Sequence, residues 1–124
     1  MTRATTTTTL YERLGGAEGI AAISADIVEL HSVNPLIRTR FEGKDKAELR
    51  KLVAQFFSMG SGGPAEYEGR DMRTAHKGMN LDERELVASI DDVLQALDTH
   101  GIDAGTRGEV LAILYSLKDE VLYQ

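Results

Sequence analysis

Apolar residues recur three and four positions apart along most of the chain, which is the spacing of an amphipathic helix. The longer stretches with this spacing are residues 17–31, 45–59 and 82–97, and a last one begins at Asp103. Their inward positions are predicted to be Ile20, Ile23, Ile27 and Leu30; Leu49, Leu52, Val53, Phe56 and Phe57; Leu86, Val87, Ile90, Val93, Leu94 and Leu97; and Val110, Leu111, Leu114, Leu117 and Val121. No stretch alternates with the period of two that is typical of a strand, so the predicted fold class is all-α.

The ends of these helices are marked by residues that cap or break a helix. Acceptor side chains with a glutamate three positions on stand at three predicted starts: Thr9 with Glu12, Asp45 with Glu48, and Asp82 with Glu85. Gly15–Gly16 ends a short first helix. Asn34–Pro35 separates the second helix from a brief helix that runs to Phe41.

Composition and charge narrow the classes of protein that fit the chain. Its 124 residues, of which 42% are hydrophobic, suit one domain, predicted to span residues 9–124 after a flexible tail of residues 1–8. The absence of cysteine excludes disulfides and thiolate-bound metal centres. A formal charge of −6 without a basic cluster argues against a nucleic-acid partner, and no apolar run is long enough for a membrane span. We therefore expect a soluble cytoplasmic protein that binds neither nucleic acid nor membrane.

A different pattern occupies residues 62–78, where glycine and proline interrupt the helical spacing before a single histidine, His76. Residues 62–64 stop a helix, because glycine weakens it and proline lacks the donor that it needs. Residues 71–77 then leave room for about two helical turns. The soft apolar side chains predicted to share a face beside the histidine are Met72, Ala75 and Met79. Spacing alone favours an ordinary surface or partly buried histidine on a connecting helix.

The order of these motifs resembles the signature of truncated haemoglobins, most closely their first group. The motifs are Gly62-Gly63-Pro64, Tyr67, Gly69, Met72 and His76-Lys77-Gly78, together with residues 10–16, Asn34-Pro35 before Phe41, and Phe56-Phe57. The resemblance covers almost the whole chain. It implies a two-over-two helical sandwich with one haem b between the helix pairs, and His76 as the proximal ligand to its iron. A backbone carbonyl near Met72 or Arg73 is expected to orient the other ring nitrogen of His76.

The resemblance also implies which side chains contact the haem. The cofactor-binding residues expected on this basis are His76, Phe41, Leu49, Val53, Phe57, Met72, Arg73, Lys77, Met79 and Leu81. Phe41 matches the ring that packs on the haem face. The candidate partners of the two haem propionates are Arg50, Lys51, Arg73 and Lys77, of which Arg73 and Lys77 are favoured because they flank His76.

On the distal side, where a gas would bind, the sequence departs from the family's common pattern. A Phe-Tyr pair is usual where Ile27-Val28 stand, and glutamine is frequent where Val53 stands. Leu49 matches a position that is often apolar in the first group. The distal ligand pocket is thus expected to consist of Ile27, Val28, Leu49 and Val53, without a hydrogen-bond donor. Such a pocket suits CO and NO, whereas dioxygen is held best by a donor.

Two further histidines have less defined roles. His100 precedes Gly101 at a predicted helix end, where a cation is favoured by the helix dipole, and it is expected to be a surface cap. His31 ends the second predicted helix. It either caps that end, which we favour, or enters the distal pocket, where it could donate to a ligand or bind the iron.

The function implied by the resemblance is reversible binding of O2, CO or NO at ferrous haem iron, as in oxygen binding or transport, without catalytic residues. Its expected partners are the gas and an unidentified reductase, and the chain is expected to be a monomer or a weak homo-oligomer. One alternative is a nitric-oxide dioxygenase or peroxidase-like enzyme, against which the missing donor and general acid or base argue. Another is a globin-like sensor or interaction module with weak or no haem binding.

Overall fold

The computed structural model describes residues 9–64 and 66–124, so the predicted tail of residues 1–8 lies outside it. Helices form all of the regular secondary structure there: α1 (Leu10–Arg13), α2 (Gly16–Val33), the 3₁₀ helix η1 (Arg38–Phe41), α3 (Lys46–Gly60), α4 (Met72–His76), α5 (Glu83–Thr99), α6 (Ala104–Ser116) and α7 (Lys118–Val121). The described part of the chain has no strand, only one isolated bridge between Leu81 and Leu122. The all-α prediction is confirmed. None of the described helices is long and apolar enough to cross a membrane.

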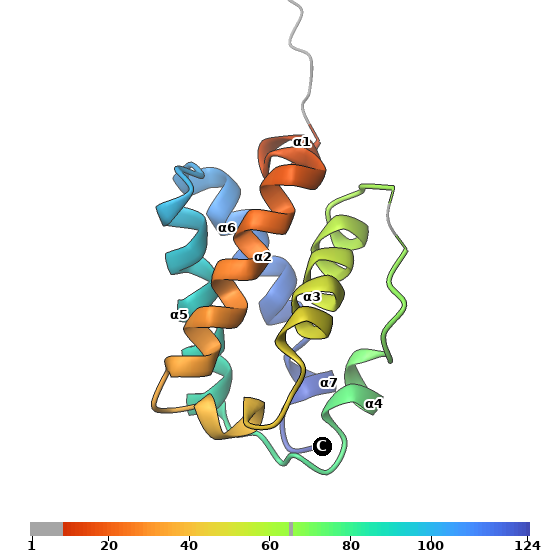
Figure 1. The fold of residues 1–124 in the computed structure, drawn as a ribbon, viewed down its shortest axis with the longest axis vertical. Coiled ribbons are helices and arrows are strands. Elements are labelled where there is room, and N and C mark those ends of the chain that lie inside the picture. Colours follow the sequence, from red (N-terminus) through yellow and green to blue (C-terminus); the bar gives the residue numbers. More distant parts are fainter. Residues whose placement is uncertain (1–8, 65) are drawn as a thin grey trace, which may run out of the picture.

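Helix α2 lies at the centre and packs on α3 on one side and on α5 on the other, while α6 packs on α5 (Figure 1). The chain reverses direction between α2 and α3 and again between α5 and α6, so the two helices of each pair are antiparallel (Figure 1). The buried cluster between them comes largely from the predicted apolar stripes: Leu14, Ile20, Ile23, Ile27, Val93, Ala96, Leu97 and Val110. Burial of these side chains is what holds the two pairs together.

The predicted capping side chains define where the helices begin. Thr9 and Glu12 form a complete capping box, with N–H to side-chain distances of 3.1 and 3.0 Å. Asp82 and Glu85 form a second one, with distances of 2.9 and 3.3 Å. Asp45 accepts hydrogen bonds from the first turn of α3 without the reciprocal bond from a glutamate. Each side chain satisfies backbone donors that the first turn leaves unpaired.

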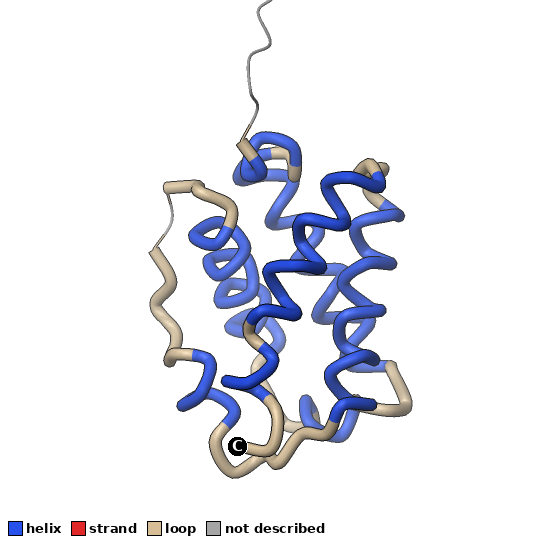
Figure 2. Tube along the Cα trace, turned by 180° about the vertical axis from the view of Figure 1, so that it is seen from behind, coloured by secondary structure: helices blue, strands red, loops and turns tan. Residues whose placement is uncertain are grey.

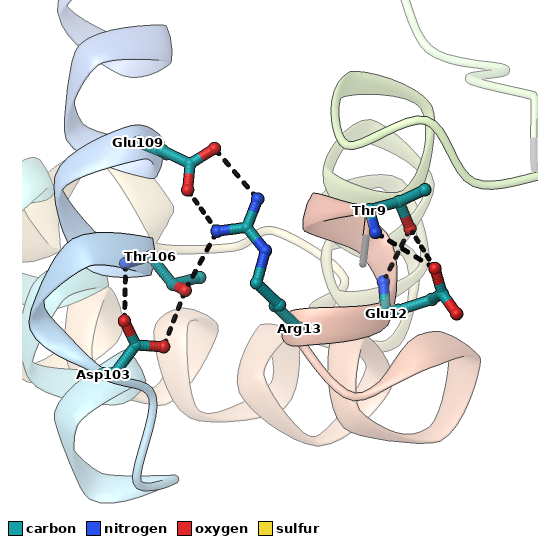
Figure 3. A network of polar contacts seen from close by, with 6 residues as sticks. All are labelled: Thr9, Glu12, Arg13, Asp103, Thr106 and Glu109. Carbon is teal, nitrogen blue, oxygen red and sulfur yellow. Dashed lines mark hydrogen bonds and ion pairs between the residues drawn. The ribbon is translucent and has the colours of Figure 1, made fainter. Parts of the chain in front are cut away.

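A polar network ties α1 to the start of α6 (Figure 3). Arg13 forms a two-pronged ion pair with Glu109 and donates to the hydroxyl of Thr106 at 3.2 Å. Thr106 in turn donates to Asp103, the N-cap of α6, at 2.7 Å. The hydrogen bond from Arg13 lowers the pKa of Glu109, so this carboxylate stays charged in the ion pair. The network fixes the short α1 against the opposite helix pair.

The prediction of one continuous last helix is wrong, because the helix is interrupted at Leu117. The N–H of Leu117 bonds to the carbonyl of Leu114 three residues back, which tightens the turn and ends α6. Helix α7 then points in a new direction and packs on α4. This bend brings Val121 into a second buried cluster with Leu81, Leu86 and Ile90.

Three other local expectations are also wrong. Val87 and Leu111 are 54% and 38% exposed, because each lies beside the stripe that the neighbouring helix covers. The brief helix expected before Phe41 is a turn followed by the 3₁₀ helix η1. The side chain of Asn34 accepts from the N–H of Leu36 at 3.0 Å, which replaces the first turn of a helix by a side-chain turn.

Candidate functional site

A cavity of about 390 Å³ opens between α2, α3, α4 and α5, a volume in the range of roughly 300–1,000 Å³ usual for small-molecule and cofactor sites. Its wall is mainly aliphatic and aromatic. Of the residues singled out from the sequence, the cavity brings together Ile27, His31, Phe41, Leu49, Val53, Phe57, Met72, His76, Met79 and Leu81. The sequence-based site residues thus come from elements spread over residues 27–81.

Three of the expected site residues do not line the cavity. Val28 is buried, but it lies on a side of α2 that does not border this space. Arg73 donates to the side chain of Gln124 at 3.2 Å. Lys77 is exposed after the end of α4. Neighbouring positions on a helix point in different directions, and on α2 it is Ile27, one residue before Val28, that reaches the cavity.

His76 lies in the last turn of α4, a helix that begins where the side chain of Asp71 accepts from the N–H of Thr74 at 2.8 Å. The Nδ1 of His76 bonds to the carbonyl oxygen of Met72 at 2.7 Å, which confirms the expected orienting carbonyl. Because a carbonyl only accepts, Nδ1 carries a hydrogen, and in the neutral imidazole Nε2 then carries the lone pair. Nε2 has no hydrogen-bond partner within residues 9–64 and 66–124, so it is available to bind a metal ion.

The long connection before α4 runs beside α3 (Figure 2). The side chain of Gln55 on α3 exchanges hydrogen bonds with Glu68 at 2.5 and 3.1 Å. Gly62 takes a φ of +89°, as expected of a glycine that reverses the chain. Glycine is required at position 63 for a steric reason, because a Cβ there would clash with the ring of Tyr11. The glycines therefore let the connection leave α3 and pass close to α1 on its way to the histidine.

His31 is largely buried and bonds to a partner on another helix. Its Nδ1 donates to Asp92 on α5 at 2.8 Å, and Asn34 donates to both carboxylate oxygens of Asp92 at 3.1 Å. The imidazole stacks on Phe41 with ring centroids 5.3 Å apart. His31 therefore lines the cavity and joins α2 to α5, and the helix cap that the sequence favoured is wrong.

Burial lowers the pKa of His31 below its ordinary value of 6.5, although the carboxylate of Asp92 acts in the opposite direction. The imidazole is therefore neutral at pH 7. Its one N–H is at Nδ1 and is used by Asp92, so Nε2 is a lone pair that cannot donate. A neutral His31 contributes no hydrogen-bond donor to the cavity through Nε2.

The lowered pKa of His31 predicts a stability loss in mild acid. Above pH 6.5, the ordinary value, both the folded and the unfolded histidine are neutral, and the contribution to stability is fully present. As the pH falls through the folded-state pKa, the unfolded chain binds the proton first and the free energy of unfolding decreases. Urea unfolding between about pH 7.5 and 5, around the unperturbed histidine pKa, should show this slope.

The matched variants for this measurement are His31→Gln and His100→Gln. His100 is exposed and bonds to Asp26 on the surface. The His31→Gln protein should lose the slope, whatever its absolute stability, and the His100→Gln protein should keep it. An equal slope in wild type and His31→Gln would mean that His31 is not the group that titrates.

Several polar side chains of the cavity wall were not among the expected site residues: Arg40, Lys44, Tyr67, Arg70, Glu85 and Ser89. Arg40 is held by Glu85 at 2.7 and 3.0 Å. Lys44 and Arg70 have no ion pair among the described residues. Burial raises the pKa of Tyr67, so its hydroxyl stays protonated. Their sequence positions could have indicated the two cations, because Lys44 lies three residues after Phe41 and Arg70 lies just before α4.

The model of the bacterial-like globin family matches residues 9–123. A group 1 truncated haemoglobin from Synechocystis is 32% identical over 111 residues, which cover 85% of this chain and 88% of that protein. The chain belongs to the truncated haemoglobins. A group 1 member from Tetrahymena pyriformis is 27% identical over 114 residues, 92% of this chain and 94% of its own length.

Solved structures agree with this assignment. The Fe(III) form of the truncated haemoglobin from Tetrahymena pyriformis superimposes with a TM-score of 0.91 at 26% identity, covering 94% of this chain and all of that one. The 2/2 haemoglobin from Synechococcus shares the fold, with a TM-score of 0.85 at 23% identity over 93% of this chain and 98% of that one. The two-over-two helical sandwich of this truncated haemoglobin is thereby confirmed.

Proposed function

We propose that this truncated haemoglobin binds one haem b in the cavity through Nε2 of His76. The observation that carries the proposal is a histidine in an apolar cavity whose Nδ1–H is held by a backbone carbonyl, leaving Nε2 as a free lone pair. A carbonyl that accepts from Nδ1 in this way fixes the tautomer that a metal ion needs. When bound, the ferrous haem would supply an iron atom that binds O2, CO or NO reversibly.

The cavity wall supports a distal side with few donors. Ile27, Leu49 and Val53 border the cavity from α2 and α3, and none of them can donate a hydrogen bond. His31 also borders it, but the neutral imidazole uses its N–H on Asp92. These side chains would exclude water and leave a gas ligand largely without hydrogen bonds, which favours CO and NO relative to dioxygen.

We further propose that Lys44 and Arg70 face the haem propionates, in place of the expected pair Arg73 and Lys77. Both are cations of the cavity wall, and neither forms an ion pair within the described residues. Arg40 also borders the cavity, but its guanidinium is already neutralised by Glu85. Free cations at an otherwise apolar cavity suit a flat apolar cofactor with two acidic edges.

Titration of the haem-free protein with haemin tests both proposals. Wild type should bind one haemin per chain, with a Soret band and a ferrous form that binds CO. A Lys44→Ala, Arg70→Ala double variant should lose haem roughly two- to thirtyfold faster, since each exposed pair contributes about 0.2–1 kcal/mol. The matched control is Lys77→Ala, which should release haem at the wild-type rate.

Two results would contradict these proposals separately. Absence of a stoichiometric Soret band in wild type would favour the haem-free sensor or interaction module. A normal Soret band with equal haem loss from the double variant and from Lys77→Ala would leave haem binding intact and remove Lys44 and Arg70 from the propionate site.

A further inference from the structure

The loop after His76, residues 78–81, is hydrogen-bonded to residues 122–124. We call these two segments together the seam. Three backbone hydrogen bonds join them: Gly78 N to Gln124 O at 3.1 Å, Asn80 N to Gln124 O at 3.0 Å, and Tyr123 N to Leu81 O at 2.9 Å. Leu81 and Leu122 also form the isolated parallel bridge. Segments about 40 positions apart in the sequence therefore lie side by side (Figure 1).

Helix α4 has few other constraints on its position. It has only five residues and follows a long connection without regular structure. Its main packing partner is α7, the helix that leads directly into the seam. Arg73 on α4 adds a side-chain bond to Gln124 at 3.2 Å. The place of His76 relative to the cavity is thus tied to residues 118–124 through these contacts.

The backbone of the seam is strained on both sides. Asn80 and Tyr123 have φ values of +48° and +55°, and they are the only non-glycine residues with positive φ in residues 9–64 and 66–124. A side chain disfavours this conformation, so it persists only where the surroundings impose it. The side chain of Tyr123 does not explain this conformation, because it is 61% exposed and makes no hydrogen bond to the described residues.

We infer that the seam is a positioning element for His76, which sets how far Nε2 reaches into the cavity. The inference rests on the proposed function, because it assumes that His76 holds the haem iron. Opening the seam would free the loop after α4 and let the short helix shift or fray. The bond between the histidine and the iron would then be weaker and more variable, although neither Tyr123 nor Gln124 borders the cavity.

Tyr123→Pro and Tyr123→Gly form a matched pair that tests the inference. Both remove the same exposed side chain. Proline also removes the N–H that bonds to Leu81 and forbids a positive φ, whereas glycine keeps the N–H and relieves the strain. The measurements are haem transfer to an excess of a haem-scavenging apoprotein, the iron–histidine stretching band of the ferrous protein, and amide hydrogen exchange at Gly78 and Asn80 in the haem-free protein.

We expect Tyr123→Pro to lose haem about tenfold faster than wild type, the factor equivalent to 1.4 kcal/mol or about one net hydrogen bond. Its iron–histidine band should shift and broaden, and exchange at Gly78 and Asn80 should accelerate. Tyr123→Gly should match wild type or retain haem longer. Gln124→Ala, which removes only the side-chain bonds of Gln124, should change haem loss in the same direction as Tyr123→Pro by a smaller factor.

The outcomes separate this inference from the proposed function. If wild type binds haem through His76 and both Tyr123 variants show the wild-type band and rate, the positioning role is wrong. If Tyr123→Pro is less stable but keeps the wild-type band, the seam only stabilises the fold, and the positioning role is also wrong. If wild type binds no haem, the proposed function fails and the inference fails with it.

Discussion

Replacing His76 with glycine is expected to abolish the wild-type coordination of haem iron and to weaken haem retention more than any other single substitution. The variant removes the only cavity imidazole whose N–H is held by a carbonyl and whose other nitrogen is free among the described residues. The ferrous spectrum should lose its histidine-ligated form, and the haem stoichiometry should fall below one per chain. Added imidazole should restore much of the spectrum, because it occupies the space that the side chain leaves.

The matched control for this prediction is His100→Gly, which removes an exposed histidine bonded to Asp26. It should leave both the spectrum and the stoichiometry unchanged. An unaltered ferrous spectrum in the His76→Gly protein would move the ligand elsewhere. His31 would then be the residue to test, since it is the other imidazole on the cavity wall.

Installing a donor on the distal side should have the second largest effect. Val53 borders the cavity from α3, and Val53→Gln places an amide where bound dioxygen can accept a hydrogen bond. A hydrogen bond to a charged acceptor contributes roughly 1.5–3 kcal/mol, so oxygen release should slow about ten- to a hundredfold. CO release should change much less, because bound CO carries little negative charge. Stopped-flow dissociation of both gases measures the difference.

Val53→Met is the matched control, because methionine has nearly the length of glutamine and no donor. It should leave the ratio of oxygen to CO release close to that of wild type. Val28→Tyr is the less suitable test, since Val28 is buried outside the cavity and a larger ring would overpack the core. Slow oxygen release in wild type itself would show that the cavity already holds a donor, with Tyr67 the first to examine.

The helices and their starts could be predicted from local pattern, because the apolar stripes and the caps act within one or two turns. The capping boxes of Thr9 and Asp82 are examples. The contacts between the helices were harder to predict from the sequence. His31 and Asp92 are 61 positions apart, and the local sequence around either residue does not indicate that the other is its partner.

The candidate site divides in the same way. His76 could be singled out because the order of the motifs around it resembles that of truncated haemoglobins, while the direction of Val28 on α2 and the partner of Arg73 depend on packing. The break at Leu117 was hidden because the apolar stripe continues through it to Val121. The bend allows α7 to pack on α4, and this contact could not be predicted from the local sequence.

The network between α1 and α6 has a consequence for the order of folding. Arg13 and Glu109 are 96 positions apart, so their ion pair closes a loop that contains most of the core. Forming it early would fix a long loop before that loop's own contacts exist, and loop closure grows less favourable with length. The pair should therefore form after the transition state. Its removal should speed unfolding while leaving the folding rate nearly unchanged.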